Sequence, residues 1–158
     1  MQPKGNDFKA LQILHRALLT GMLMLAVIIT FLVISRGPFK ELGSSEKILQ
    51  IIVLLVSVGG TAAGFTLFNK KIQAIPPMDP VKDRISAYRS AAIVRWALIE
   101  LPTLFSLISF LLTGNYAFLA LGIALMLVFT VVRPAKLMIV YLLKLTEKEV
   151  SELEGASE

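Results

Sequence analysis

The chain has 158 residues, of which 56% are hydrophobic, and it contains no cysteine. The absence of cysteine excludes disulfides, thiolate metal sites and cysteine nucleophiles. The formal net charge is +5, but no basic helix face with interleaved aromatic residues accompanies it, so we expect no nucleic-acid partner. The apolar residues gather in long blocks instead of at amphipathic spacing, which is typical of an integral membrane protein and not of a soluble domain.

Four apolar blocks predict four membrane-spanning helices, at residues 17–34, 49–68, 96–112 and 117–132. A spanning helix needs about 20 apolar residues, within a range of about 17–25. The fourth block is short and reaches this length only with Tyr116 at one end and a snorkelling Arg133 at the other. The expected fold is therefore an all-α, four-helix transmembrane bundle made of two helical hairpins, with the membrane domain at residues 1–145.

The third helix is expected to be much longer than its span. Asp79-Pro80 is a strong helix start, because aspartate is a good N-cap and proline fits the first helical position. No further break occurs before Leu112 except Pro102, so the helix would be about 50 Å long, against a hydrocarbon core of about 30 Å. We expect it to extend into the cytoplasm, where an apolar stripe through Tyr88 packs on the chain's own loop and tail or docks a partner.

The C-terminal part of the chain is expected to leave the membrane. Residues 135–145 are apolar with lysines near their ends and predict an amphipathic segment at the membrane interface. Thr146 and Glu149 have the spacing of a capping box, which predicts a short helix in an acidic cytoplasmic tail at residues 146–158. This tail either folds onto the basic start of the third helix or keeps the terminus solvated.

The positions of the sixteen Lys and Arg residues predict the topology. Three lie before or at the first span, six lie between the second and third spans, and four follow the fourth. Only three lie between the first and second spans, and none lies between the third and fourth. By the positive-inside rule, thirteen basic residues against three place both termini and the middle loop in the cytoplasm. We expect this membrane to be a bacterial inner membrane. The ring of His15 is expected to lie among the lipid headgroups, and the alternative is a role in a proton relay.

Glu100 is the first candidate for a functional site, because it is the one charged residue within the four apolar blocks. A charged side chain at the centre of a membrane helix costs roughly 2.5–3.5 kcal/mol. Arg95 is a poor partner on the same helix, since five positions correspond to 140° of rotation, whereas Arg16 and Arg133 end other spans on the same side. Two alternatives follow: a buried pair with one of these arginines, or an ion or proton site beside a kink at Pro102.

Small residues mark the expected helix-packing surfaces. Gly21 forms a small-xxx-small pair with Ala17 in the first span, and Gly60 and Gly64 form a GxxxG motif in the second. Such motifs let two helix backbones approach closely in lipid. We expect the second motif to serve packing within the chain, with dimerisation and a ligand-approach surface as the alternatives.

Three functions remain open. The first is a non-enzymatic accessory or assembly subunit of a larger membrane complex. The second is a small oligomeric channel or transporter, coupled to protons or ions, that uses Glu100. The third is an enzyme acting on an apolar substrate with Arg89, Arg95 and Glu100, which we favour least because the sequence has no metal-binding spacing, nucleophile elbow or phosphate-binding glycine loop. We therefore expect no metal and no cofactor; the expected partners are the lipid bilayer and either a membrane protein or further copies of the chain.

Overall fold

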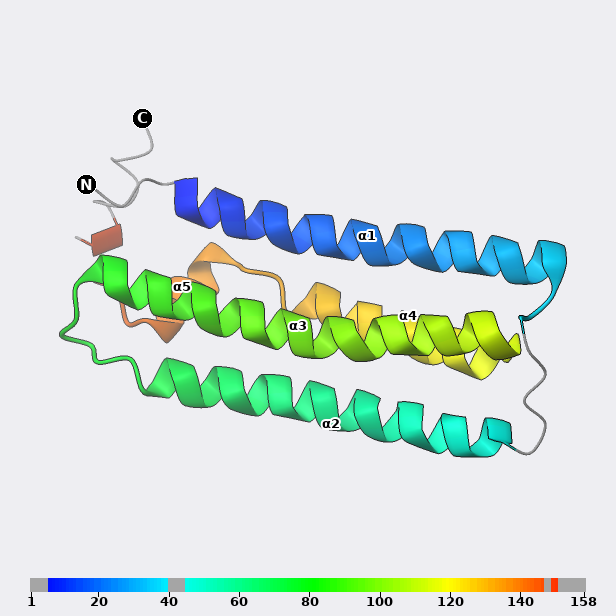
Figure 1. Ribbon diagram of the computed structural model, residues 1–158. Coiled ribbons are helices and arrows are strands. Elements are labelled where there is room, and N and C mark those ends of the chain that lie inside the picture. Colours follow the sequence, from blue (N-terminus) through cyan, green and yellow to red (C-terminus); the bar gives the residue numbers. More distant parts are fainter. Residues whose placement is uncertain (1–5, 40–44, 147–148, 151–158) are drawn as a thin grey trace.

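The computed structural model describes residues 6–39, 45–146 and 149–150, and these ranges contain five helices and no strand (Figure 1). The helices are α1 (Asn6–Arg36), α2 (Ser45–Gln73), α3 (Val81–Thr113), α4 (Tyr116–Val131) and α5 (Lys136–Leu142). The predicted all-α class is therefore confirmed for these ranges. Each of the four predicted blocks lies within one of the first four helices, except that the last block runs one residue beyond α4.

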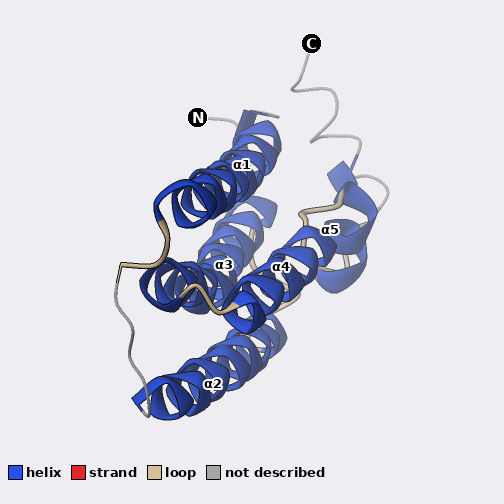
Figure 2. Ribbon diagram, turned by 90° about the vertical axis from the view of Figure 1, so that its right-hand side faces the viewer, coloured by secondary structure: helices blue, strands red, loops and turns tan. Residues whose placement is uncertain are grey.

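α3 is the central helix, and α1, α2 and α4 all pack against it. In the view down the helices, α1 and α2 lie on opposite sides of α3, with α4 beside α3 on a third side (Figure 2). α1 also contacts α4, but α1 and α2 share no extensive contact. The prediction of two packed hairpins is therefore wrong for the first pair. The small-residue face of α2, at Gly60 and Gly64, lies against α3 instead of α1.

Three helices are long and apolar enough to cross a membrane: α1, α2 and α3. α4 has only 16 residues, and it forms a fourth span only if it is taken together with α5, from which it is bent by 69°. Large apolar side chains face outward along these helices, as Phe31 and Leu55 do with 67% and 66% of their surface exposed. A continuous apolar exterior of this kind fits an integral membrane protein.

The ends of α3 and α4 follow local signals in the sequence. α3 begins at Val81 with Pro80 as its N-cap residue, one position later than expected, and runs through Pro102 to Thr113 without interruption. It ends at Gly114, which adopts a left-handed conformation with φ of 69° and donates its N–H to the Phe110 carbonyl. The Asn115 side chain then accepts a hydrogen bond from the Ala117 N–H at 2.9 Å and caps α4.

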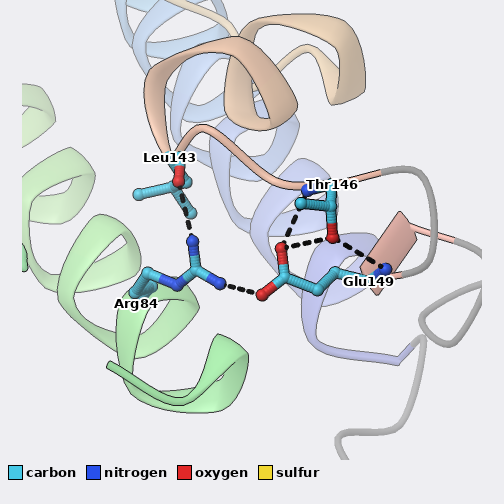
Figure 3. A network of polar contacts seen from close by, with 4 residues as sticks. All are labelled: Arg84, Leu143, Thr146 and Glu149. Atoms are coloured by element: carbon cyan, nitrogen blue, oxygen red, sulfur yellow. Dashed lines mark hydrogen bonds and ion pairs between the residues drawn. The ribbon is translucent and has the colours of Figure 1, made fainter. Parts of the chain in front are cut away.

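The C-terminal segment folds back onto the start of α3 (Figure 3). The Arg84 guanidinium donates one hydrogen bond to the Leu143 carbonyl at 3.0 Å and forms an ion pair with Glu149. Glu149 also accepts the Thr146 N–H at 2.8 Å, as the predicted capping box requires. The Thr146 N–H and the Arg84 guanidinium hold the pKa of the Glu149 carboxyl below its ordinary range. Of the two alternatives for the tail, the structure shows folding onto α3 for the described residues Thr146, Glu149 and Val150. Residues 147–148 and 151–158 lie outside the described part.

Candidate functional site

The end of α4 exposes backbone carbonyls that the helix cannot pair by itself. α4 ends at Val131, and Pro134 follows three residues later. A proline nitrogen carries no hydrogen, and the last turn of any helix leaves carbonyl groups without an N–H partner. Within an apolar environment such groups need donors from elsewhere in the protein.

Side chains from α1 and α3 supply these donors. The His15 Nε2 donates to the Phe129 carbonyl at 3.0 Å. The Trp96 Nε1 and the Arg95 Nη2 both donate to the Val132 carbonyl, at 3.2 Å and 3.3 Å. We call these five residues, His15, Arg95, Trp96, Phe129 and Val132, the α4-end cluster. A cation at a helix C-terminus is also favoured by the helix dipole, which suits Arg95.

Aromatic contacts hold the His15 ring inside the α4-end cluster. The ring stacks on Phe129 with centroids 4.6 Å apart and meets the edge of Trp96 at 5.0 Å. Only 4% of the His15 surface is exposed, so the prediction that the ring lies among lipid headgroups is wrong. A carbonyl oxygen can only accept, so in the neutral ring the proton is on Nε2. His15 therefore serves as a cap for α4.

Arg95 connects three helices. Its guanidinium lies 3.7 Å from the centre of the Phe68 ring on α2, in addition to its hydrogen bond to α4. The side chain is buried, and its Nε has no hydrogen-bond partner. Arg95 thus packs against α2 and caps α4.

Glu100 is half-buried within α3. Among the described residues, no ion pair or hydrogen bond joins it to Arg16, Arg95 or Arg133. The structure therefore does not bring the predicted buried pair together.

The glycines predicted for helix packing lie in two different environments. A Cβ atom on Gly60 would stand 2.9 Å from the Leu98 carbonyl oxygen, and one on Gly64 would stand 3.3 Å from the Arg95 carbonyl oxygen. Pro102 packs against the same position, with its Cγ 3.4 Å from the Gly60 Cβ site. Gly60, Gly64 and Pro102 thus form a close part of the α2–α3 contact. Gly21 has no atom of another helix within 4 Å of its Cβ site and lies on an exposed face.

Arg16 and Arg133 meet at a groove and not at Glu100. The groove has a volume of about 420 Å³ and lies between α1 and the bend that joins α4 to α5. Its lining residues are Gln12, His15, Arg16, Leu19, Thr130, Arg133, Pro134 and Ala135. We call it the α1–α4 groove. Both arginines are exposed, and no carboxylate is among the lining residues.

Two arrangements common in enzymes are absent from the part of the chain that the structure describes. In the described ranges no three His, Asp or Glu side chains come together as metal ligands. The one histidine is occupied by a backbone carbonyl, with no carboxylate beside it to orient it as a general base. Comparison with protein-family models, curated proteins and solved structures finds no match to the chain.

Proposed function

We propose that the chain is a non-enzymatic accessory or assembly subunit of a larger membrane complex. It crosses the membrane four times, with both termini and the α2–α3 connection in the cytoplasm, and its setting is a bacterial inner membrane. The distribution of Lys and Arg supports this orientation. The tail contact between Arg84 and Glu149 agrees with it, since α3 would meet the tail on the cytoplasmic side.

The observation that carries the proposal is Glu100, a carboxylate in the spanning part of α3 with no ion pair among the described residues. Placing its charge within the membrane costs roughly 2.5–3.5 kcal/mol, and only a proton, water or a donor group removes this cost. Every arginine named as an internal partner is engaged elsewhere or lies at the α1–α4 groove. A donor from another membrane protein is the partner that a subunit would find on assembly.

The second candidate is a small oligomeric transporter or channel that uses Glu100. Two buried hydroxyls on α2, those of Ser57 and Thr61, have no hydrogen-bond partner and favour a polar route between α2 and α3. The carbonyl of Leu98, freed by Pro102, lies on this same side against Gly60. Glu100, however, is two residues from Leu98, about 200° around the helix. The Glu100 side chain thus leaves α3 on the side away from the α2 hydroxyls. A polar route that joins them is therefore less favoured than the subunit proposal.

The test is affinity purification of the tagged chain in mild detergent, followed by mass determination of the intact complex. The wild type should retain a larger partner in fixed stoichiometry, and Glu100→Gln should lose it while its melting temperature stays unchanged. Asp83→Asn is the matched control, because it neutralises an exposed carboxylate on the same helix before the span.

A different outcome would redirect the proposal. If the wild type runs as a lone bundle or as a homo-oligomer, the subunit proposal fails. Proton and ion flux into liposomes would then be compared for the wild type and Glu100→Gln. Loss of flux with an intact fold would establish the transporter in its place.

A further inference from the structure

We infer that the α1–α4 groove binds the phosphate of an anionic phospholipid headgroup. This inference rests on the proposed membrane insertion and is independent of any protein partner. The two groups that would contact the phosphate are the guanidinium groups of Arg16 and Arg133, which line the groove from α1 and from the segment after α4.

The charge of the groove is complementary to a phosphate. Arg16 and Arg133 form no ion pair with a carboxylate in the described ranges, and none of the lining residues is acidic. Guanidinium groups bind phosphate oxygens through paired N–H donors, more strongly than neutral donors do. Two such groups facing one groove of about 420 Å³ therefore form a site for a single phosphate-bearing headgroup.

The other polar groups of the groove are already engaged. The Gln12 amide donates to the Pro134 carbonyl at 3.4 Å, and the Thr130 hydroxyl donates to the Leu127 carbonyl at 2.7 Å. The His15 Nε2 is occupied by the Phe129 carbonyl. These bonds fix the walls of the groove and leave the two arginines as its uncommitted donors, so the site is preorganised for an anion.

The position of the groove selects a lipid over a soluble phosphate. Arg16 directly precedes the first apolar block and Arg133 directly follows the last one, so both lie where headgroups meet the apolar core. Leu19 lines the groove, and Leu23 and Leu127 are exposed further along the same helices. Leu19 and Leu23 lie three and seven residues after Arg16, on the same face of α1, and Leu127 lies three residues before Thr130, which lines the groove. An acyl chain can follow this apolar path while its phosphate stays in the groove.

The test uses the full chain, reconstituted in vesicles of equal parts phosphatidylglycerol and phosphatidylcholine, extracted in mild detergent and weighed by native mass spectrometry. The variant is the double substitution Arg16→Gln and Arg133→Gln. Its matched control is Lys70→Gln with Lys82→Gln, which removes the same charge from exposed positions at the same end of the bundle but outside the groove. A second arm adds inorganic phosphate at millimolar concentration.

We expect the wild type and the lysine control to retain phosphatidylglycerol in preference to phosphatidylcholine. The arginine variant should lose this preference by about tenfold, since charge-assisted bonds to phosphate are strong. Equal losses in both variants would overturn the inference, as would displacement of the lipid by inorganic phosphate, which would indicate a site for a soluble anion. A wild type that retains neither lipid would also overturn the inference, whereas a chain that does not incorporate into the vesicles would refute the proposed membrane insertion. Unchanged melting of both variants is required for each comparison.

Discussion

The α2–α3 contact and the α4-end cluster hold α3 by different kinds of interaction. Against α2, Gly60 and Gly64 make a close approach, because their missing side chains admit the backbone of α3. The buried hydroxyls of Ser57 and Thr61 on this face make no hydrogen bond. Against the end of α4, two side chains of α3 and His15 of α1 instead donate to backbone carbonyls through bonds of 3.0–3.3 Å.

The difference shows how a bundle is held where lipid removes the hydrophobic drive between helices. Between α2 and α3 the close fit of the two helices holds the contact, even though Pro102 removes the N–H that would pair the Leu98 carbonyl there. Directional bonds are needed where a helix ends inside the bundle, as α4 does before Pro134. Arg95 takes part in both contacts, since its carbonyl lies against Gly64 and its guanidinium bonds α4.

The largest effect is expected where the shape-based contact is filled. Gly60→Val places a Cβ 2.9 Å from the Leu98 carbonyl oxygen, a backbone atom that cannot move by itself. We expect a loss of about 2–3 kcal/mol in the free energy of unfolding, as for overpacked cores. Trp96, the one tryptophan in the chain and buried at the α4-end cluster, reports unfolding by its fluorescence.

Gly59→Val is the control for this substitution. It changes helix propensity by the same amount on the same helix, but nothing lies within 4 Å of its Cβ site. Equal destabilisation by the two valines would show that close approach at Gly60 does not hold α2.

The next effect concerns the bond from His15 to α4. His15→Phe keeps an aromatic ring against Phe129 but removes the donor for its carbonyl. We expect a loss of about 1–2 kcal/mol, the range for a buried acceptor left without a partner and for bonds between membrane helices. Thermal unfolding followed by circular dichroism measures it, with Ile13→Phe at a 66% exposed position as the control. If His15→Phe is as stable as the wild type, the hydrogen bond from His15 does not stabilise the α4-end cluster, and only the packing of its rings does.

A smaller effect is expected at Arg95, where the two kinds of contact meet. Arg95→Met keeps the apolar stem but removes the guanidinium from Phe68 and from the Val132 carbonyl. The cost of burying the charge offsets most of this loss, and Trp96 still donates to the same carbonyl, so we expect a change below about 1 kcal/mol.

Combining Arg95→Met with Trp96→Phe leaves the Val132 carbonyl without either donor. The double variant should therefore lose more stability than the two single variants together, as measured by circular dichroism in a double-mutant cycle. If the losses in the free energy of unfolding are strictly additive, Arg95 and Trp96 do not substitute for one another as donors to the Val132 carbonyl.

The smallest effect is expected at the C-terminal tail. A substitution there tests whether hydrogen bonds and ion pairs outside the membrane stabilise the fold as much as those at the α4-end cluster. Glu149 has a lowered pKa because it accepts the Thr146 N–H and faces Arg84. Its stabilising contribution is therefore complete above the ordinary carboxyl pKa and is lost as the pH falls through the lowered value. Glu149→Gln should remove the contribution at every pH.

Hydrogen exchange of the segment from Leu143 to Thr146 measures this contact, after correction for the intrinsic effect of pH on exchange. We expect exchange to rise about two- to fivefold in Glu149→Gln at pH 7, and in the wild type only at low pH, because the Glu149 side chain is 25% exposed and water weakens its ion pair with Arg84. Asp83→Asn is the control at an exposed carboxylate near the start of α3. Unchanged exchange in Glu149→Gln would mean that the bond from Arg84 to the Leu143 carbonyl holds the tail alone.

Several features of the fold and the site were open to prediction because their signals are local. The apolar blocks located the helices, and the Thr146 to Glu149 spacing predicted the capping box. Gly60 and Gly64 marked a close contact in advance, although not the helix they would meet. Arg84 was missed, because its burial depends on the tail; only 3% of its surface is exposed.

The sequence by itself determined where the helices lie, where they end and which residue carries a charge among apolar neighbours, because these follow from composition and from interactions within a few residues. The tertiary structure alone decided that α3 is central, that α1 and α2 lie apart, and that Arg16 and Arg133 share a groove while Glu100 forms no ion pair among the described residues. The bond from His15 to Phe129 spans 114 positions and that from Trp96 to Val132 spans 36. Apolar helices of similar composition can be packed in several orders, so contacts at such separations become visible only once the helices are assembled.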